Sequence, residues 1–130
     1  MEKRTVWSDF TREGGQKAMF HVLEWEPDAV FCANDLMALG ALDVLHSHGI
    51  AVPVGGADRI PSAEFAVKTG DMTATVGPRG DDVALGVIPA MDDFLTSGVI
   101  SSGFLAENHV VTRESLQRER RGRQRYMPAW

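Results

Sequence analysis

The feature that most constrains the fold is a regular alternation of short apolar runs with amphipathic segments of helical length. Three runs, "PDAVFCA", "IAVPVGG" and "MTATV", have the composition of strands, and a helical segment follows each of them closely. Such an alternation with short connections predicts a mostly parallel sheet with flanking helices, an α/β fold. With 130 residues, of which 44% are apolar, the chain is long enough to bury one modest core.

The periodicity predicts helices over residues 11–24, 35–48, 61–69 and 81–96. Gly49, Gly70 and Gly98 follow the last three, where a left-handed C-cap belongs. Pro89 falls inside the last helix and is expected to kink it. "KRTVWSDF" is predicted to be an opening strand and "ENHVVT" a closing one, which makes five strands. The unbroken apolar run in "PDAVFCA" predicts a strand that is buried on both faces.

Charge is distributed unevenly along the chain. From Thr112 onward there are six arginines and two glutamates, a net charge of +4. The whole chain has a net charge of −5, so the residues before Thr112 have a net charge of −9. An acidic body argues against direct nucleic-acid binding by the fold, because duplex binding needs a basic face. We therefore divide the chain into a folded body, residues 1–115, and a basic tail, residues 116–130, expected to be solvated and poorly ordered.

The sequence offers weak support for an enzyme, a metal or a cofactor. Cys32 lies in an apolar run and lacks the electropositive setting that activates a thiol nucleophile. His46 and His48 are two residues apart on a predicted helix and so do not share a face. The glycine-rich "VGGADRIP" matches neither a dinucleotide nor a phosphate loop. No signal peptide or membrane-length apolar run is present, so the sequence assigns no compartment.

Polar and aromatic side chains follow the predicted strands at their carboxyl ends. In a parallel sheet these positions share one edge, where α/β folds bind ligands. Carboxylates and amides bind sugar hydroxyls, and aromatic rings pack on the C–H faces of a sugar. The set therefore predicts a polyol site made of Phe10, Asn34, Asp58 and Arg79. A structural role is open for three of them: Asn34 as a helix cap, Asp58 in an Asx-turn and Phe10 in the core.

Three segments carry a family resemblance: "PDAVFCANDLMALGALDVLHSHGI", "VGGADRIPSAEFAVKTGDMTATV" and "HVVTRES". They resemble the C-terminal lobe of type I periplasmic sugar-binding proteins of the ribose-binding kind, a fold shared by lac repressor family ligand-binding domains. The resemblance implies that Phe10 stacks on a sugar and that Asn34 and Asp58 bind its hydroxyls. Two positions depart from the family pattern: Ala57 replaces an aromatic residue, and Gly77, Pro78 and Arg79 replace an expected glutamine.

The resemblance implies two alternative functions. One is the sugar-binding lobe of a solute-binding protein for an ABC importer, which is periplasmic and meets a membrane permease. The other is the effector-binding and dimerisation domain of a cytoplasmic lac repressor family regulator. The segment "AVKTGDMTATV" favours the first, because a helix that ends in Lys-x-Gly-Asp is typical of the binding proteins. In both, the N-terminal lobe and the first strand and helix of this lobe are missing, so we expect weak or no sugar binding by the chain alone and self-association through an uncovered sheet edge.

Overall fold

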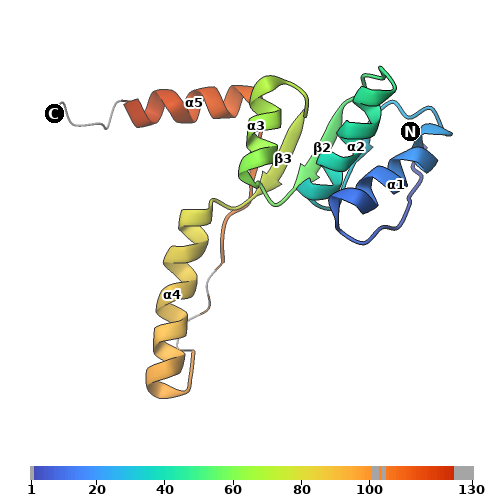
Figure 1. The fold of residues 1–130 in the computed structure, drawn as a ribbon. Coiled ribbons are helices and arrows are strands. Elements are labelled where there is room, and N and C mark those ends of the chain that lie inside the picture. The colour runs from blue at the N-terminus through green and yellow to red at the C-terminus, as the bar shows by residue number, and fades with distance from the viewer. Residues whose placement is uncertain (1, 101–102, 104, 125–130) are drawn as a thin grey trace.

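The part of the chain that the structure describes forms a four-stranded sheet with five helices, an α/β arrangement (Figure 1). The computed structural model describes residues 2–100, 103 and 105–124. The elements are α1 (Arg12–Leu23), β1 (Val30–Phe31), α2 (Asp35–Ser47), β2 (Val54–Ala57), α3 (Pro61–Thr69), β3 (Ala74–Gly77), α4 (Gly80–Ser97), β4 (His109–Val111) and α5 (Arg113–Gln124). The strand order is β1-β2-β3-β4, with β1, β2 and β3 parallel and β4 antiparallel to β3. The predicted mostly parallel α/β fold is confirmed.

Local chemistry explains where the central helices begin and end. The Asn34 side chain caps α2, and Pro61 occupies the first turn of α3, where its missing N–H costs nothing. Gly70 and Gly98 end α3 and α4 in the left-handed conformation, with φ of +94° and +73°. A residue with a side chain adopts that conformation only with strain, which is why glycine stands there.

The hydrophobic core lies on one face of the sheet. Helix α2 packs against α1 and β2, and α3 packs against β3. The buried side chains at this interface include Met19, Leu45, Val54 and Val67. On the other face Phe31 is 71% exposed, so the prediction that its strand is buried on both faces is wrong. In the described part of the chain, helices cover only one side of the sheet there, so an unbroken apolar run does not secure burial.

Two glycines set the close approach of α1 and α2. A Cβ added to Gly15 would lie 2.4 Å from the carbonyl oxygen of Met37. A Cβ added to Gly40 would lie 2.0 Å from the carbonyl oxygen of Arg12. Both distances are far inside van der Waals contact and involve backbone atoms. The two helices therefore pack backbone to backbone, and these positions require glycine.

The predicted opening strand is absent. Residues 3–9 of "KRTVWSDF" form neither strand nor helix, and Trp7 is 92% exposed. The parallel edge strand of the described sheet, β1, is only two residues long. A strand gains its stability from pairing, and so short an edge offers few hydrogen bonds. The described sheet therefore has four strands and not five.

The last two helices project from this body. Helix α4 has no buried residue and extends away from the sheet (Figure 1). Helix α5 crosses the predicted boundary between residues 115 and 116. The prediction of a poorly ordered tail is therefore wrong for residues 116–124. Residues 125–130 of that tail lie outside the described range. The arginine, glutamate and glutamine residues of α5 have high helix propensity. Among the described residues, no helix combines the length and the apolar character needed to span a bilayer.

Candidate functional site

The carboxyl ends of the three parallel strands bring the predicted site residues to one edge of the sheet. Asn34 follows β1, Asp58 follows β2, and Arg79 follows β3. Phe10 comes from the segment before α1 and joins this edge because its carbonyl oxygen accepts a hydrogen bond from Asn34 Nδ2 at 2.9 Å. Phe10 is 59% exposed, so it is not a core residue.

Asn34 is a helix cap and also a bridge. Its Oδ1 accepts from the backbone N–H of Met37 at 2.9 Å, and the residue has the extended backbone typical of an N-cap. The same amide donates to Phe10, so both of its ends make hydrogen bonds within the chain. A side-chain amide has a second N–H and a second lone pair on the oxygen. Asn34 can therefore hold Phe10 in place and still offer one donor and one acceptor.

Asp35, next to Asn34 in the sequence, is a buried structural carboxylate that is not among the predicted site residues. It accepts from the Thr75 hydroxyl at 2.7 Å and from the Ile60 backbone N–H at 2.9 Å. Burial raises the pKa of Asp35, and the Thr75 and Ile60 hydrogen bonds oppose that shift. Gly56 makes room for it, since an added Cβ would lie 2.4 Å from the Asp35 carboxylate. Asp35 thus ties α2 to the loop after β2.

Asp58 and Arg59 form a turn with an unusual backbone. Their φ angles are +103° and +59°, a region that residues with side chains rarely adopt. The Asp58 N–H donates to Val76 O at 2.8 Å, and the Arg59 N–H donates to the Thr75 hydroxyl at 3.2 Å. These bonds hold the turn against β3 and leave the Asp58 side chain exposed at the sheet edge.

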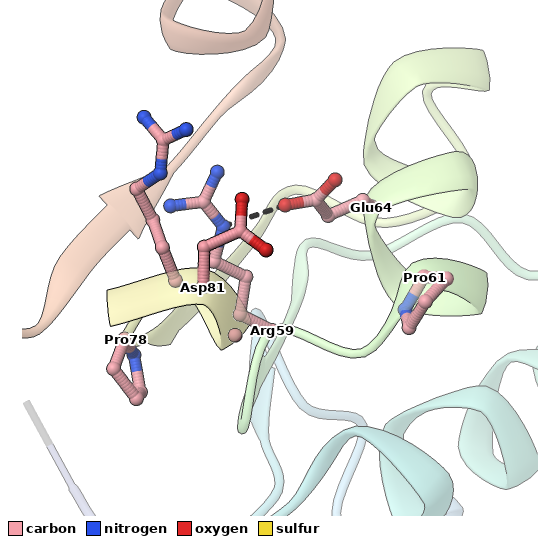
Figure 2. A pocket seen from close by; sticks show the side chains of 7 residues that line it. Arg59, Pro61, Glu64, Pro78 and Asp81 are labelled. Carbon is pink, nitrogen blue, oxygen red and sulfur yellow. Dashed lines mark hydrogen bonds and ion pairs between the residues drawn. The ribbon is translucent and has the colours of Figure 1, made fainter. Parts of the chain in front are cut away.

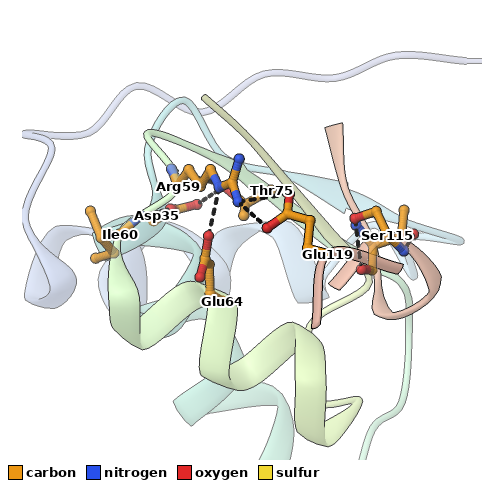
Figure 3. A network of polar contacts seen from close by, with 8 residues as sticks. Asp35, Arg59, Ile60, Glu64, Thr75, Ser115 and Glu119 are labelled. Carbon is orange, nitrogen blue, oxygen red and sulfur yellow. Dashed lines mark hydrogen bonds and ion pairs between the residues drawn. The ribbon is translucent and has the colours of Figure 1, made fainter. Parts of the chain in front are cut away.

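The Arg59 side chain holds this turn in place through two ion pairs. It is only 5% exposed and forms an ion pair with Glu64 at 2.5 Å, seen in Figure 2, and one with Glu119 of α5 at 3.1 Å, seen in Figure 3. Burial lowers the pKa of Arg59, but the hydrogen bond and charge of Glu64 and the charge of Glu119 outweigh it and keep the pKa above its ordinary value. Helix α5 is thereby attached to the loop that carries Asp58.

A small pocket lies beside this turn, at the start of α4. It has a volume of about 240 Å³ and is lined by Arg59, Pro61, Glu64, Pro78, Arg79, Gly80 and Asp81 (Figure 2). Arg79 therefore faces the pocket with Arg59, whereas Phe10 and Asn34 do not line it. Arg59 is not among the predicted site residues, because nothing local in the sequence indicates that its guanidinium turns inward.

The other candidate chemistries find no support in the described residues. Burial raises the pKa of the Cys32 thiol to about 11, so the thiolate needed for nucleophilic attack is scarce at neutral pH. Within the described ranges, no group of three or more histidine, cysteine, aspartate or glutamate side chains is arranged to hold a metal ion.

Comparison with known sequences identifies the relatives of the chain. Residues 2–55 match the family described as periplasmic binding protein-like domain. The ribose import binding protein RbsB of Salmonella typhimurium is 34% identical over 110 residues, which cover 82% of this chain and 37% of that protein. The transcriptional repressor CytR of Escherichia coli is 33% identical over 115 residues, 84% of this chain and 33% of the repressor. The chain spans about a third of the length of these relatives.

Solved structures share the fold. An ABC transporter periplasmic solute-binding protein from Actinobacillus succinogenes with bound D-allose superposes with a TM-score of 0.74 at 28% identity, covering 85% of this chain and 40% of that one. The myo-inositol-binding protein of Caulobacter gives 0.75 at 27% identity, covering 89% and 42%. These relatives are binding proteins and repressors rather than enzymes, as the sequence interpretation expected. The chain is thus part of a periplasmic binding protein-like domain, homologous to ribose- and allose-binding proteins and to the CytR repressor.

Proposed function

We propose that this chain supplies one side of a monosaccharide-binding cleft in a solute-binding protein of a sugar ABC importer. The observation that carries the proposal is the gathering of Phe10, Asn34 and Asp58 at the carboxyl edge of a sheet whose relatives include ribose- and allose-binding proteins. Open α/β sheets bind ligands at this edge.

Each residue has a distinct role in this proposal. The exposed ring of Phe10 stacks on the apolar face of the sugar, and the exposed carboxylate of Asp58 accepts from adjacent hydroxyls. The free donor and acceptor of Asn34 serve one further hydroxyl. Arg79, half-buried after β3, supplies a cationic donor where the family resemblance leads one to expect a glutamine.

The remaining side of the cleft comes from the rest of the binding domain in this proposal. A site open on one side buries too little of a sugar for tight binding, because such sites gain affinity by enclosing most of the ligand surface. We therefore expect strong binding only when the N-terminal lobe is present. An ABC permease is the further partner that this function implies, and the periplasm is the corresponding compartment.

The homology to CytR favours a second candidate, an effector-binding and dimerisation domain of a lac repressor family regulator in the cytoplasm. Translation of the genomic sequence upstream of Met1 discriminates the two. A helix-turn-helix region encoded in frame supports the regulator, and a secretory signal peptide supports the importer component.

The proposed site is tested by calorimetric titration of ribose, allose and myo-inositol into the chain joined to its N-terminal lobe. Asp58→Ala and Asn34→Asp should each weaken binding about tenfold to hundredfold, the size of a mismatched buried hydrogen bond of about 1–3 kcal/mol. Asp28→Ala is the matched control, because Asp28 is an exposed carboxylate before β1, at the opposite edge. Unchanged affinity in both site variants would refute the site and leave Asn34 with its two structural roles, the cap of α2 and the hydrogen bond to Phe10.

A further inference from the structure

The pocket at the start of α4 contains a buried cationic donor without a partner. The Arg59 side chain is 95% buried, since 5% is exposed, and its Nη1 makes no hydrogen bond within the part of the chain that the structure describes. The other nitrogens of this guanidinium are engaged by Glu64 and Glu119. Buried polar atoms nearly always have a partner, so an unpaired one beside a pocket points to a missing ligand.

The first turn of α4 adds a second source of positive potential. This helix is 18 residues long, and its N-cap residue, Arg79, makes no side-chain hydrogen bond to the first turn. Unpaired N–H groups at a helix N-terminus attract anions. The Arg79 side chain also lines the pocket and forms no ion pair among the described residues. Arg59, Arg79 and the N–H groups of α4 therefore converge on one small volume.

The pocket also presents a carboxylate. Asp81 lines it, is exposed and makes no ion pair within the described ranges, whereas Glu64 is already paired with Arg59. A pocket for a simple anion would be weakened by this negative charge. A ligand that carries an anionic group at one end and hydroxyls at the other uses both, because an ionised carboxylate accepts from hydroxyls.

We infer that this pocket binds the acidic end of a sugar acid, a polyol that bears a carboxylate. The ligand carboxylate pairs with Arg59 Nη1 and Arg79, in the two-point geometry that guanidinium groups favour, and a neighbouring hydroxyl donates to Asp81. Because protein atoms enclose Nη1, binding requires a pocket-lining side chain to move aside, a fast motion for an exposed side chain. The volume of about 240 Å³ suits a group of monosaccharide size or smaller.

The inference rests on the proposed function for its ligand class, but the pocket is built entirely from this chain. The experiment therefore uses the 130-residue chain itself, with D-galacturonate, neutral D-galactose and inorganic phosphate titrated in separate calorimetric runs. Galacturonate should bind at least tenfold more tightly than galactose. Equal binding of the two sugars overturns the anionic contact, and phosphate binding as tightly as galacturonate overturns the hydroxyl contact at Asp81.

Variants locate the contacts. Arg79→Gln and Arg59→Lys should each weaken galacturonate binding at least tenfold, and Arg79→Gln keeps the test valid if loss of Arg59 disturbs folding. Asp81→Asn should weaken galacturonate and strengthen phosphate. Lys17→Gln is the matched control, because it removes one positive charge from an exposed position on α1. Galacturonate affinity unchanged in Arg79→Gln overturns the inference.

The two proposals fail separately. Galacturonate binding by the chain, together with no neutral-sugar binding by the protein carrying both lobes, refutes the monosaccharide cleft alone. Neutral-sugar binding by the two-lobed protein that is sensitive to Asp58→Ala, with no galacturonate binding by the chain, refutes the acidic pocket alone.

Discussion

Helices α2 and α4 are both rich in apolar residues, yet α2 is mostly buried and α4 is not. Nine of the 13 residues of α2 are buried, whereas none of the 18 residues of α4 is. The difference lies in the neighbours and not in composition, since α2 packs between α1 and β2 while α4 extends away from the sheet (Figure 1). Apolar content therefore indicates that a helix packs, but not against what.

The course of the chain around α4 suggests where its partner lies. The chain leaves the sheet after β3, forms α4, and returns as β4, which pairs antiparallel with β3. Large apolar side chains stay exposed on this excursion, including Leu85, Ile88 and Leu95. We propose that they pack against the N-terminal lobe, in line with relatives that are about two and a half times as long as the matched segment.

The largest expected difference between the two helices is in their contribution to stability. Leu45 of α2 is fully buried, so Leu45→Ala should lower the free energy of unfolding by about 2–5 kcal/mol. Leu95 of α4 is 79% exposed, so Leu95→Ala should change it by no more than about 0.5 kcal/mol. Urea denaturation of the isolated chain measures both. Similar losses would mean that α4 is packed in solution.

The second contrast concerns glycine in the same two helices. Alanine normally stabilises a helix by about 1 kcal/mol relative to glycine. Gly40→Ala should nevertheless destabilise the chain by about 1–3 kcal/mol, because the new methyl group collides with the Arg12 carbonyl and forces α1 and α2 apart. Gly80→Ala, at a position with open space in α4, should be neutral or slightly stabilising. Thermal melts monitored by circular dichroism compare the two, and a stable Gly40→Ala chain would disprove the backbone contact.

Sequence reasoning succeeded where the determinants are local. The expected bounds of residues 61–69 match α3 because Pro61 and Gly70 mark its two ends, and α2 and α4 end within one residue of expectation. The opening strand was wrong because a strand depends on partners elsewhere in the chain. Likewise, Arg59 forms an ion pair with Glu119, which lies 60 residues later in the sequence, and no local pattern indicates such a contact.

The third prediction tests what covers the apolar surface of α4 when the chain is alone. We expect the isolated chain to self-associate at tens of micromolar, because exposed apolar surface of this extent promotes contact between copies. The double variant Leu85→Glu with Leu95→Glu should weaken association about tenfold, or about 1.4 kcal/mol. Leu105→Glu is the control, since Leu105 is exposed but lies outside α4. Sedimentation equilibrium measures the effect, and a larger effect of the control would place the contact elsewhere.

The smallest predicted effect is electrostatic and confined to the packed region. Arg12 of α1 forms an ion pair with Asp43 of α2 at 2.7 Å, and its hydrogen bond lowers the pKa of that carboxyl. A lowered pKa in the folded state gives stability that is present above the ordinary value near 3.8 and is lost as the pH falls through the folded pKa. Both side chains are more than a third exposed, so screening by solvent limits the contribution to less than about 1 kcal/mol. Arg12→Gln should therefore lower the free energy of unfolding slightly at pH 7 and leave it unchanged at pH 2.

Asp92→Asn is the control for this prediction. Asp92 is an exposed carboxylate of α4, so its substitution should have no effect at either pH. Urea denaturation at the two pH values measures the difference, and an equal loss at pH 2 would assign the role of Arg12 to packing rather than to charge.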